Sequence, residues 1–149
     1  MFLIFNEGMI MTQTLTNPLG EALRQNNHLK FLMINAIGSN DLYLPFIKAL
    51  EKNTILEELY FMNNTFTNDG VDALLNAISK NKNLNLKILY FKNVNIEDKT
   101  REQELCEELR KIETFKILYD SVQHIFKNQT QKNKESYERL KYVKRYISL

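Results

Sequence analysis

Residues 53–81 read NTILEELYFMNNTFTNDGVDALLNAISKN, and this stretch decides the fold. Its first part places Leu56, Leu59 and Phe61 in the pattern L-x-x-L-x-F, which is typical of a short strand with one buried face. Its second part, about residues 69–80, spaces apolar residues along one face of an amphipathic helix: Val71, Leu74, Leu75 and Ile78. The stretch therefore predicts one strand–turn–helix unit. Asn64 lies in the expected turn, and Asn68 and Asp69 are the expected helix caps.

The unit recurs along the chain. The motif Ala-(Leu/Ile)-x-x-Asn-x-x-Leu begins at Ala22, Ala49 and Ala77, so the steps are 49 − 22 = 27 and 77 − 49 = 28 residues. Matching strand patterns lie at about residues 29–34, 56–61 and 86–91. One such unit cannot bury its apolar face, whereas stacked copies bury a continuous core. We therefore expect an α/β solenoid of three to four units with a parallel sheet on its concave side.

A fourth copy is degenerate. Apolar residues between Leu105 and Asp120 fit the repeat template, but they fit one continuous helix over residues 101–126 equally well. We favour a short fourth strand near residues 115–120, preceded by an acidic helix over about residues 100–111.

The chain divides into three parts. They are a lead-in of residues 1–15 with a weak strand at Phe2–Phe5, a repeat domain of residues 16–126, and a basic C-terminal tail of residues 127–149. In the repeat domain we expect further helices at about 16–26 and 42–52, with Pro18 and Pro45 in their first turns.

The composition indicates one globular domain. Of 149 residues, 44% are hydrophobic and 26% charged, and the net charge of +2 argues against a nucleic-acid partner. The one cysteine, Cys106, excludes an internal disulfide, fits a reducing cytoplasmic compartment and is expected in the core. No apolar run approaches the ~20 residues of a membrane-spanning helix. We expect a monomer without stable membrane insertion.

No residue pattern indicates catalysis, a metal or a cofactor. His28 and His124 have no metal-ligand spacing, and His28 is expected to be exposed to solvent. The four glycines form no phosphate loop, and no Ser or Cys has a local nucleophile signature. We therefore expect a protein that is not an enzyme.

The candidate site follows from alternation along the strands. The leucines point into the core, so the residues between them point out of the concave face. Eight of these form the candidate row: Phe31, Met33, Glu58, Tyr60, Met62, Ile88, Tyr90 and Lys92. Tyr and Met are enriched at protein interfaces, which favours another protein as the partner, with Tyr60 and Tyr90 as anchors. A fourth strand would add Ile117, Tyr119 and Ser121 to the row.

Two other interpretations of the candidate row remain open. The C-terminal segment could fold over this face, or pairs of tyrosines on neighbouring strands could simply stabilise the sheet.

The tail is basic and amphipathic. Residues 127–149 hold seven Lys and Arg against two Glu, so the tail carries 7 − 2 = +5 and the remainder 2 − 5 = −3. A helix over 134–147 would place Tyr137, Leu140, Val143 and Ile147 on one face, with Tyr142 and Tyr146 roughly opposite. It could cap the last repeat, bind an acidic protein surface, or bind membrane or nucleic acid.

The repeat unit resembles leucine-rich repeats of the ribonuclease-inhibitor type, which implies a solenoid with protein partners. A narrower resemblance, over about residues 18–92, is to the C-terminal domain of tropomodulins and leiomodins. It rests on NHLKF at 27–31, SND at 39–41, ALEKN at 49–53 and AISKNKNL at 77–84.

That narrower resemblance implies actin binding at filament pointed ends. The alternatives are a scaffold or regulatory module for another protein, including a microbial effector that binds a host protein, and a membrane-surface role through the tail.

Overall fold

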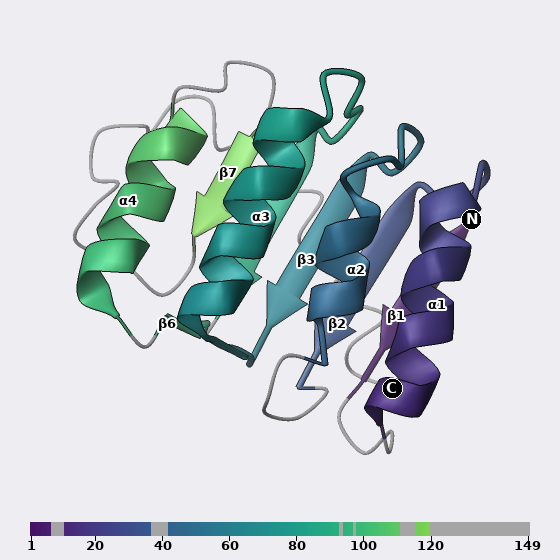
Figure 1. The fold of residues 1–149 in the computed structure, drawn as a ribbon, viewed down its shortest axis with the longest axis horizontal. Coiled ribbons are helices and arrows are strands. Elements are labelled where there is room, and N and C mark those ends of the chain that lie inside the picture. Colours follow the sequence, from purple (N-terminus) through teal and green to yellow (C-terminus); the bar gives the residue numbers. More distant parts are fainter. Residues whose placement is uncertain (7–10, 37–41, 93, 97, 111–115, 120–149) are drawn as a thin grey trace.

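The computed structural model describes residues 1–6, 11–36, 42–92, 94–96, 98–110 and 116–119. Five parallel strands form one sheet in the order β1-β2-β3-β5-β7. These strands are β1 (Phe2–Phe5), β2 (Phe31–Asn35), β3 (Glu58–Met62), β5 (Ile88–Lys92) and β7 (Lys116–Tyr119). The helices are α1 (Gln13–Gln25), α2 (Leu44–Ala49), α3 (Asn68–Lys80) and α4 (Lys99–Arg110). All four helices lie over the same face of the sheet (Figure 1).

The register confirms the stacking of the first three strand patterns. Phe31 pairs with Glu58, and Glu58 pairs with Ile88, so equivalent positions are 58 − 31 = 27 and 88 − 58 = 30 residues apart. The nine core positions expected from the strand patterns are all 0–3% exposed: Leu29, Leu32, Ile34, Leu56, Leu59, Phe61, Leu86, Leu89 and Phe91. The architecture is an α/β repeat with an open parallel sheet.

The fourth strand exists, but its register differs from the one expected. α4 ends at Arg110 and β7 begins at Lys116, so residues 101–126 are not one helix. β7 pairs with β5 one residue earlier than the repeat alignment predicts, which places Leu118 opposite Tyr90 and Lys116 opposite Ile88. Tyr119 and Ile117 therefore do not continue the candidate row, and Ser121 lies outside the described residues. The degenerate fourth unit has no asparagine to fix its register, unlike the units before it.

Asparagines join successive units through their side chains. Asn53 is 1% exposed, and its amide donates to the carbonyls of Leu23 and Asn26 at 2.7 and 3.1 Å. Its Oδ1 accepts from the backbone N–H groups of Ile55 and Leu56 at 2.9 and 2.8 Å. Asn81 bonds the carbonyls of Leu50 and Asn53 in the same way. The recurring spacing of the motif thus reflects a series of hydrogen bonds that fixes one unit on the next.

Asn64 makes similar hydrogen bonds at the carboxyl ends of β2 and β3. It is 3% exposed, and its amide donates to the carbonyls of Ile34 and Met62, both at 2.8 Å. The chain then forms β4 (Thr65–Phe66), which pairs with β6 (Asn95–Ile96) in a small second sheet that the sequence did not predict.

Two details of the helices correct the sequence expectations. α1 begins at Gln13, because the N–H groups of Leu15 and Thr16 bond the carbonyl of Thr12, so Pro18 lies inside the helix rather than in its first turn. The cap of α3 is Thr67, whose hydroxyl accepts from the N–H of Gly70 at 3.2 Å, and not Asn68 or Asp69. Pro45 does lie in the first turn of α2, as expected. Residues 39–41, which hold the SND motif, and the expected tail helix lie outside the described residues.

Gly70 allows α3 to pack on Tyr43. A Cβ at position 70 would lie 2.4 Å from the hydroxyl of Tyr43, which is 1% exposed and stacks on Phe66 with ring centroids 4.4 Å apart. The same hydroxyl accepts from the N–H of Thr67 at 3.0 Å. We expect Gly70→Ala to destabilise the protein by about 1–3 kcal/mol through overpacking, although alanine favours helices.

Thermal unfolding of Gly70→Ala in wild-type and Tyr43→Phe backgrounds checks this clash. Because Tyr43→Phe removes the clashing hydroxyl, Gly70→Ala should cost clearly less in that background. An equal cost in both backgrounds would contradict the assigned cause, and Ser79→Ala on the exposed side of α3 is the control.

Candidate functional site

The structure confirms the two faces expected from strand alternation. Leu59, Phe61 and their equivalents belong to the core beneath the helices, whereas six members of the candidate row form a separate cluster on the other face. We call these six the Tyr60 cluster: Phe31, Met33, Tyr60, Met62, Ile88 and Tyr90. The sheet therefore brings together residues that are up to 59 positions apart, since 90 − 31 = 59.

The six side chains of the Tyr60 cluster are buried rather than exposed to solvent. Its members are 0–6% exposed, with Met33 at 0% and Tyr60 at 1%. Glu58 and Lys92, the two charged members of the candidate row, keep part of their surface in solvent. The strand pattern correctly identifies the side of the sheet, but it does not predict how deeply these side chains are buried.

Aromatic rings are paired between neighbouring strands within the Tyr60 cluster. The ring of Tyr60 lies 4.8 Å from that of Phe31 and 5.4 Å from that of Tyr90, measured between centroids. The Tyr60 hydroxyl donates to Oε2 of Glu58 at 2.8 Å. These contacts are of the kind that stabilises a sheet, so the row contributes to the stability of the fold.

A charged row crosses the strands one residue before the Tyr60 cluster begins. Lys30 and Lys87 place their ammonium groups 2.9 and 2.6 Å from the two carboxylate oxygens of Glu57. Hydrogen bonds from Lys87 and then Lys30 lower the pKa of Glu57 from 4.5 to about 2. The lysines are 64% and 57% exposed, so solvent and salt screen this triad.

The triad predicts a measurable titration. We expect the Lys30→Gln/Lys87→Gln variant to raise the pKa of Glu57 from about 2 back towards 4.5, because the groups that stabilise the carboxylate are gone. A lowered folded-state pKa stabilises the fold above the unfolded value, and this stability is lost as pH falls from about 4.5 towards 2. Side-chain carboxyl NMR titration measures the pKa. A value that stays near 2 in the double variant would contradict the assignment, and Lys82→Gln is the control.

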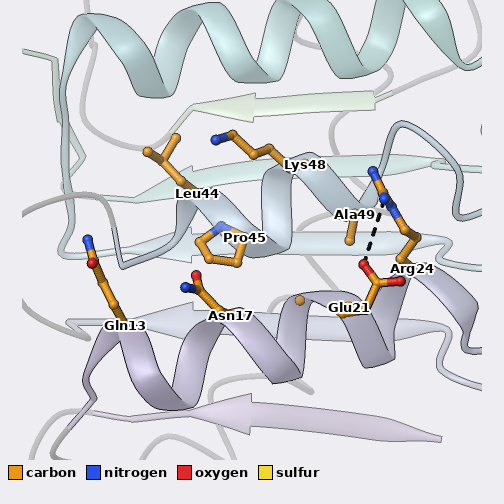
Figure 2. A pocket seen from close by; sticks show the side chains of 9 residues that line it. Gln13, Asn17, Glu21, Arg24, Leu44, Pro45, Lys48 and Ala49 are labelled. Atoms are coloured by element: carbon orange, nitrogen blue, oxygen red, sulfur yellow. Dashed lines mark ion pairs between the residues drawn. The ribbon is translucent and has the colours of Figure 1, made fainter.

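A polar groove of about 440 Å³ lies on the opposite, helical side, between α1 and α2 (Figure 2). Its walls include an ion pair between Glu21 and Arg24 at 3.7 Å and the exposed Lys48. The two helices approach closely at Gly20, where a Cβ would lie 2.6 Å from Cβ of Pro45. The groove is open and polar, and it contains no member of the candidate row.

No group of three or more His, Cys, Asp or Glu side chains among the described residues could hold a metal ion. None of the described helices is long and apolar enough to cross a membrane. His28 is exposed as expected, whereas the side chain of Cys106 lies outside the described set.

Sequence reasoning missed two contacts around the candidate row. One is the Lys30–Glu57–Lys87 triad, whose alternating signs at equivalent repeat positions could have revealed it. The other is the hydrogen bond from the Asn63 amide to Oδ1 of buried Asn35 at 2.8 Å, which lies at the carboxyl ends of β2 and β3. No local sequence signal marks that pair, since it depends on the left-handed backbone of Asn63 at φ 53°.

Comparison with solved structures identifies the fold. The chain is similar to the actin-binding site 2 of leiomodin-1, with a TM-score of 0.68 and 19% identity over 97% of this chain and 88% of that one. It is also similar to a tropomodulin C-terminal domain from Caenorhabditis elegans, with a TM-score of 0.63 and 16% identity over 96% and 87% of the two chains. No protein-family model and no curated protein matches the sequence. The chain therefore has the leucine-rich-repeat-like fold of the leiomodin and tropomodulin C-terminal domains.

Proposed function

We propose that the protein is a binding module for another protein, and that its partner is actin. The observation that carries this is the likeness, over nearly the whole length of both chains, to a leiomodin-1 domain described as an actin-binding site. The sequence motifs at 27–31, 39–41, 49–53 and 77–84 support it independently. A binding role without catalysis, in a cytoplasmic setting, fits the same likeness.

The candidate row is the proposed contact surface. Glu58 and Lys92 are the members that a partner can reach directly, because both keep exposed surface. Tyr60 and Tyr90 are 1% and 2% exposed, so they are not part of the surface that a partner meets first. We therefore expect charge changes at the accessible positions to act on binding before any change in the aromatic members does.

Elongation from actin filament pointed ends tests the proposal. We expect the wild-type chain to slow elongation and Lys92→Glu to weaken the effect about tenfold or more, as loss of an interfacial charge pair does. Lys48→Glu, the same charge change on exposed α2, is the matched control. Equal inhibition of elongation by the Lys92→Glu and Lys48→Glu variants would contradict the assignment of the contact surface to the candidate row. The Tyr60→Phe/Tyr90→Phe variant keeps both aromatic rings, so it tests whether the tyrosine hydroxyls contribute to binding.

The second function is binding of a protein other than actin through the same row. The Met and Tyr side chains of the row are of types enriched at protein interfaces in general, so they do not distinguish actin from another protein. In that case the protein leaves pointed-end elongation unchanged. The Lys92→Glu variant then fails to pull down the partner that the wild-type chain binds.

A further inference from the structure

Exposed large apolar side chains gather at the first strand of the sheet. Among the described residues they occur at four positions, and three of these lie in β1 or directly before it: Met1, Phe2 and Leu3, which are 64%, 76% and 37% exposed. The fourth is Leu15 on α1, the helix that follows β1. Neighbouring apolar side chains that remain in water mark a surface suited to contact with another protein chain.

β1 is also an edge strand. It lies at one end of the five-stranded sheet, and among the described strands it pairs with β2 alone (Figure 1). Edge strands are commonly protected from further pairing by charged residues, prolines or bulges. The opposite edge strand, β7, contains Lys116, whereas residues 1–5, MFLIF, contain neither a charged side chain nor a proline. The outer edge of β1 is therefore open to pairing with another strand.

The backbone of β1 shows which groups face the open edge. The N–H of Lys30 donates to the carbonyl of Met1 at 3.2 Å, so the carbonyl of Met1 points towards β2. Backbone groups of successive residues in a strand point alternately to its two sides. Leu3 therefore also directs its N–H and C=O towards β2, whereas Phe2 and Ile4 direct theirs to the outer edge.

A second copy of β1 fits this edge in an antiparallel register. A two-fold axis through Leu3 places Phe2 of one copy opposite Ile4 of the other. Both side chains lie on the face of the Tyr60 cluster, since Ile4 packs against that cluster and the Phe2 ring lies 5.3 Å from that of Phe31. The outward N–H and C=O groups of Phe2 and Ile4 then bond each other across the axis, as in antiparallel sheets. An axis through Ile4 would instead set Phe2 opposite the polar Asn6.

The absence of charge in the edge favours a second copy as the occupant. An edge that pairs with itself brings identical side chains together, and like charges placed opposite each other are destabilising. Residues 1–5 contain only apolar side chains, so self-pairing brings no like charges together. Because the contact rests on one short strand from each copy, we expect a weak dimer with a dissociation constant on the order of 10–100 μM.

We propose that two copies of the chain pair antiparallel through β1, with Leu3 on the two-fold axis, so that their sheets join into one. This dimer replaces the monomer expected from the sequence, and it does not depend on the identity of the partner. Its consequence rests on the proposed function: both candidate rows then lie on the same face of the joined sheet, so one dimer presents two contact surfaces to actin.

Sedimentation velocity of the full chain without actin, over about 1–500 μM, tests the association. The wild-type mass should rise from monomer to dimer and no further, because a two-fold contact is closed. Phe2→Lys should raise the dissociation constant about tenfold or more, because it puts charge into the paired edge. Leu15→Lys, the same kind of change at an exposed apolar residue of α1, is the matched control and should dimerise like the wild type.

Each other outcome overturns the proposal. A wild-type chain that stays monomeric over the whole range has no such contact. Growth beyond the dimer, undiminished dimerisation of Phe2→Lys, or equal weakening by Leu15→Lys would show that the contact lies elsewhere.

Disulfide trapping tests the register and decides the case if Phe2→Lys unfolds. In a Cys106→Ala chain, Leu3→Cys places two cysteines opposite each other at the axis, with Cα atoms about 4.5 Å apart and within disulfide reach. Phe2→Cys in the same background places them about 8–9 Å apart, which is too far. Mild oxidation should therefore trap several-fold more dimer through position 3 than through position 2.

Random collision predicts the reverse order, because position 2 is 76% exposed and position 3 only 37%. Equal trapping at the two positions, or more at position 2, overturns the proposal. Actin is absent from all of these samples, so failure here is distinguishable from failure of the proposed function.

Discussion

Asn53→Ala should lower the free energy of unfolding by about 3 kcal/mol, because it leaves several buried backbone groups without hydrogen bonds at about 1–3 kcal/mol each. The lost bonds are those to the carbonyls of Leu23 and Asn26 and those from the N–H groups of Ile55 and Leu56. Relaxation and water entry recover part of this cost, so the sum of the separate costs is an upper limit.

Chemical denaturation of Asn53→Ala and of Asn83→Ala measures the effect. Asn83 is exposed, so its replacement should change the stability by less than about 0.5 kcal/mol. Equal stability of the two variants would contradict the view that the asparagine hydrogen bonds fix one unit on the next.

Phe61→Ala should cost about 3–5 kcal/mol, the usual loss for a large aromatic side chain in a packed core. Phe61 is 0% exposed, and its ring lies 5.0 Å from that of Phe66 and 5.8 Å from that of Phe91. Removing it therefore leaves a cavity at the junction of β3, β4 and β5.

The same denaturation experiment, with Phe2→Ala as its control, checks this value. Phe2 is 76% exposed on β1, so its loss should cost less than about 1 kcal/mol. A cost for Phe61→Ala as small as that for Phe2→Ala would show that the aromatic core is not where the structure places it.

The repeat pattern predicts the core and the middle of the fold because both depend on local spacing. The burial of Leu56, Leu59 and Phe61 is predicted correctly, because a strand with one buried face requires apolar residues at these spacings. α3 is predicted within one residue at its start, because its apolar stripe is uninterrupted.

Features set by nonlocal contacts could not be predicted. The register of β7 depends on its pairing with β5, and β4 and β6 exist only because they pair with each other. Pro18 lies inside α1 because backbone hydrogen bonds to the carbonyl of Thr12 add a turn at the start of the helix. Helix propensities alone do not predict this turn. For the candidate site, alternation predicts that Tyr60 and Tyr90 share a face, but it does not predict that both side chains are buried.

The most direct test of the central claim is whether the purified, folded chain binds actin. Co-sedimentation measures the binding, and a pointed-end assay measures its effect on filament elongation. The account predicts saturable binding and slowed elongation, both weakened by Lys92→Glu and unchanged by Lys48→Glu. Absence of binding by a chain with a cooperative unfolding transition would contradict the actin assignment and leave a protein-binding module for a different partner.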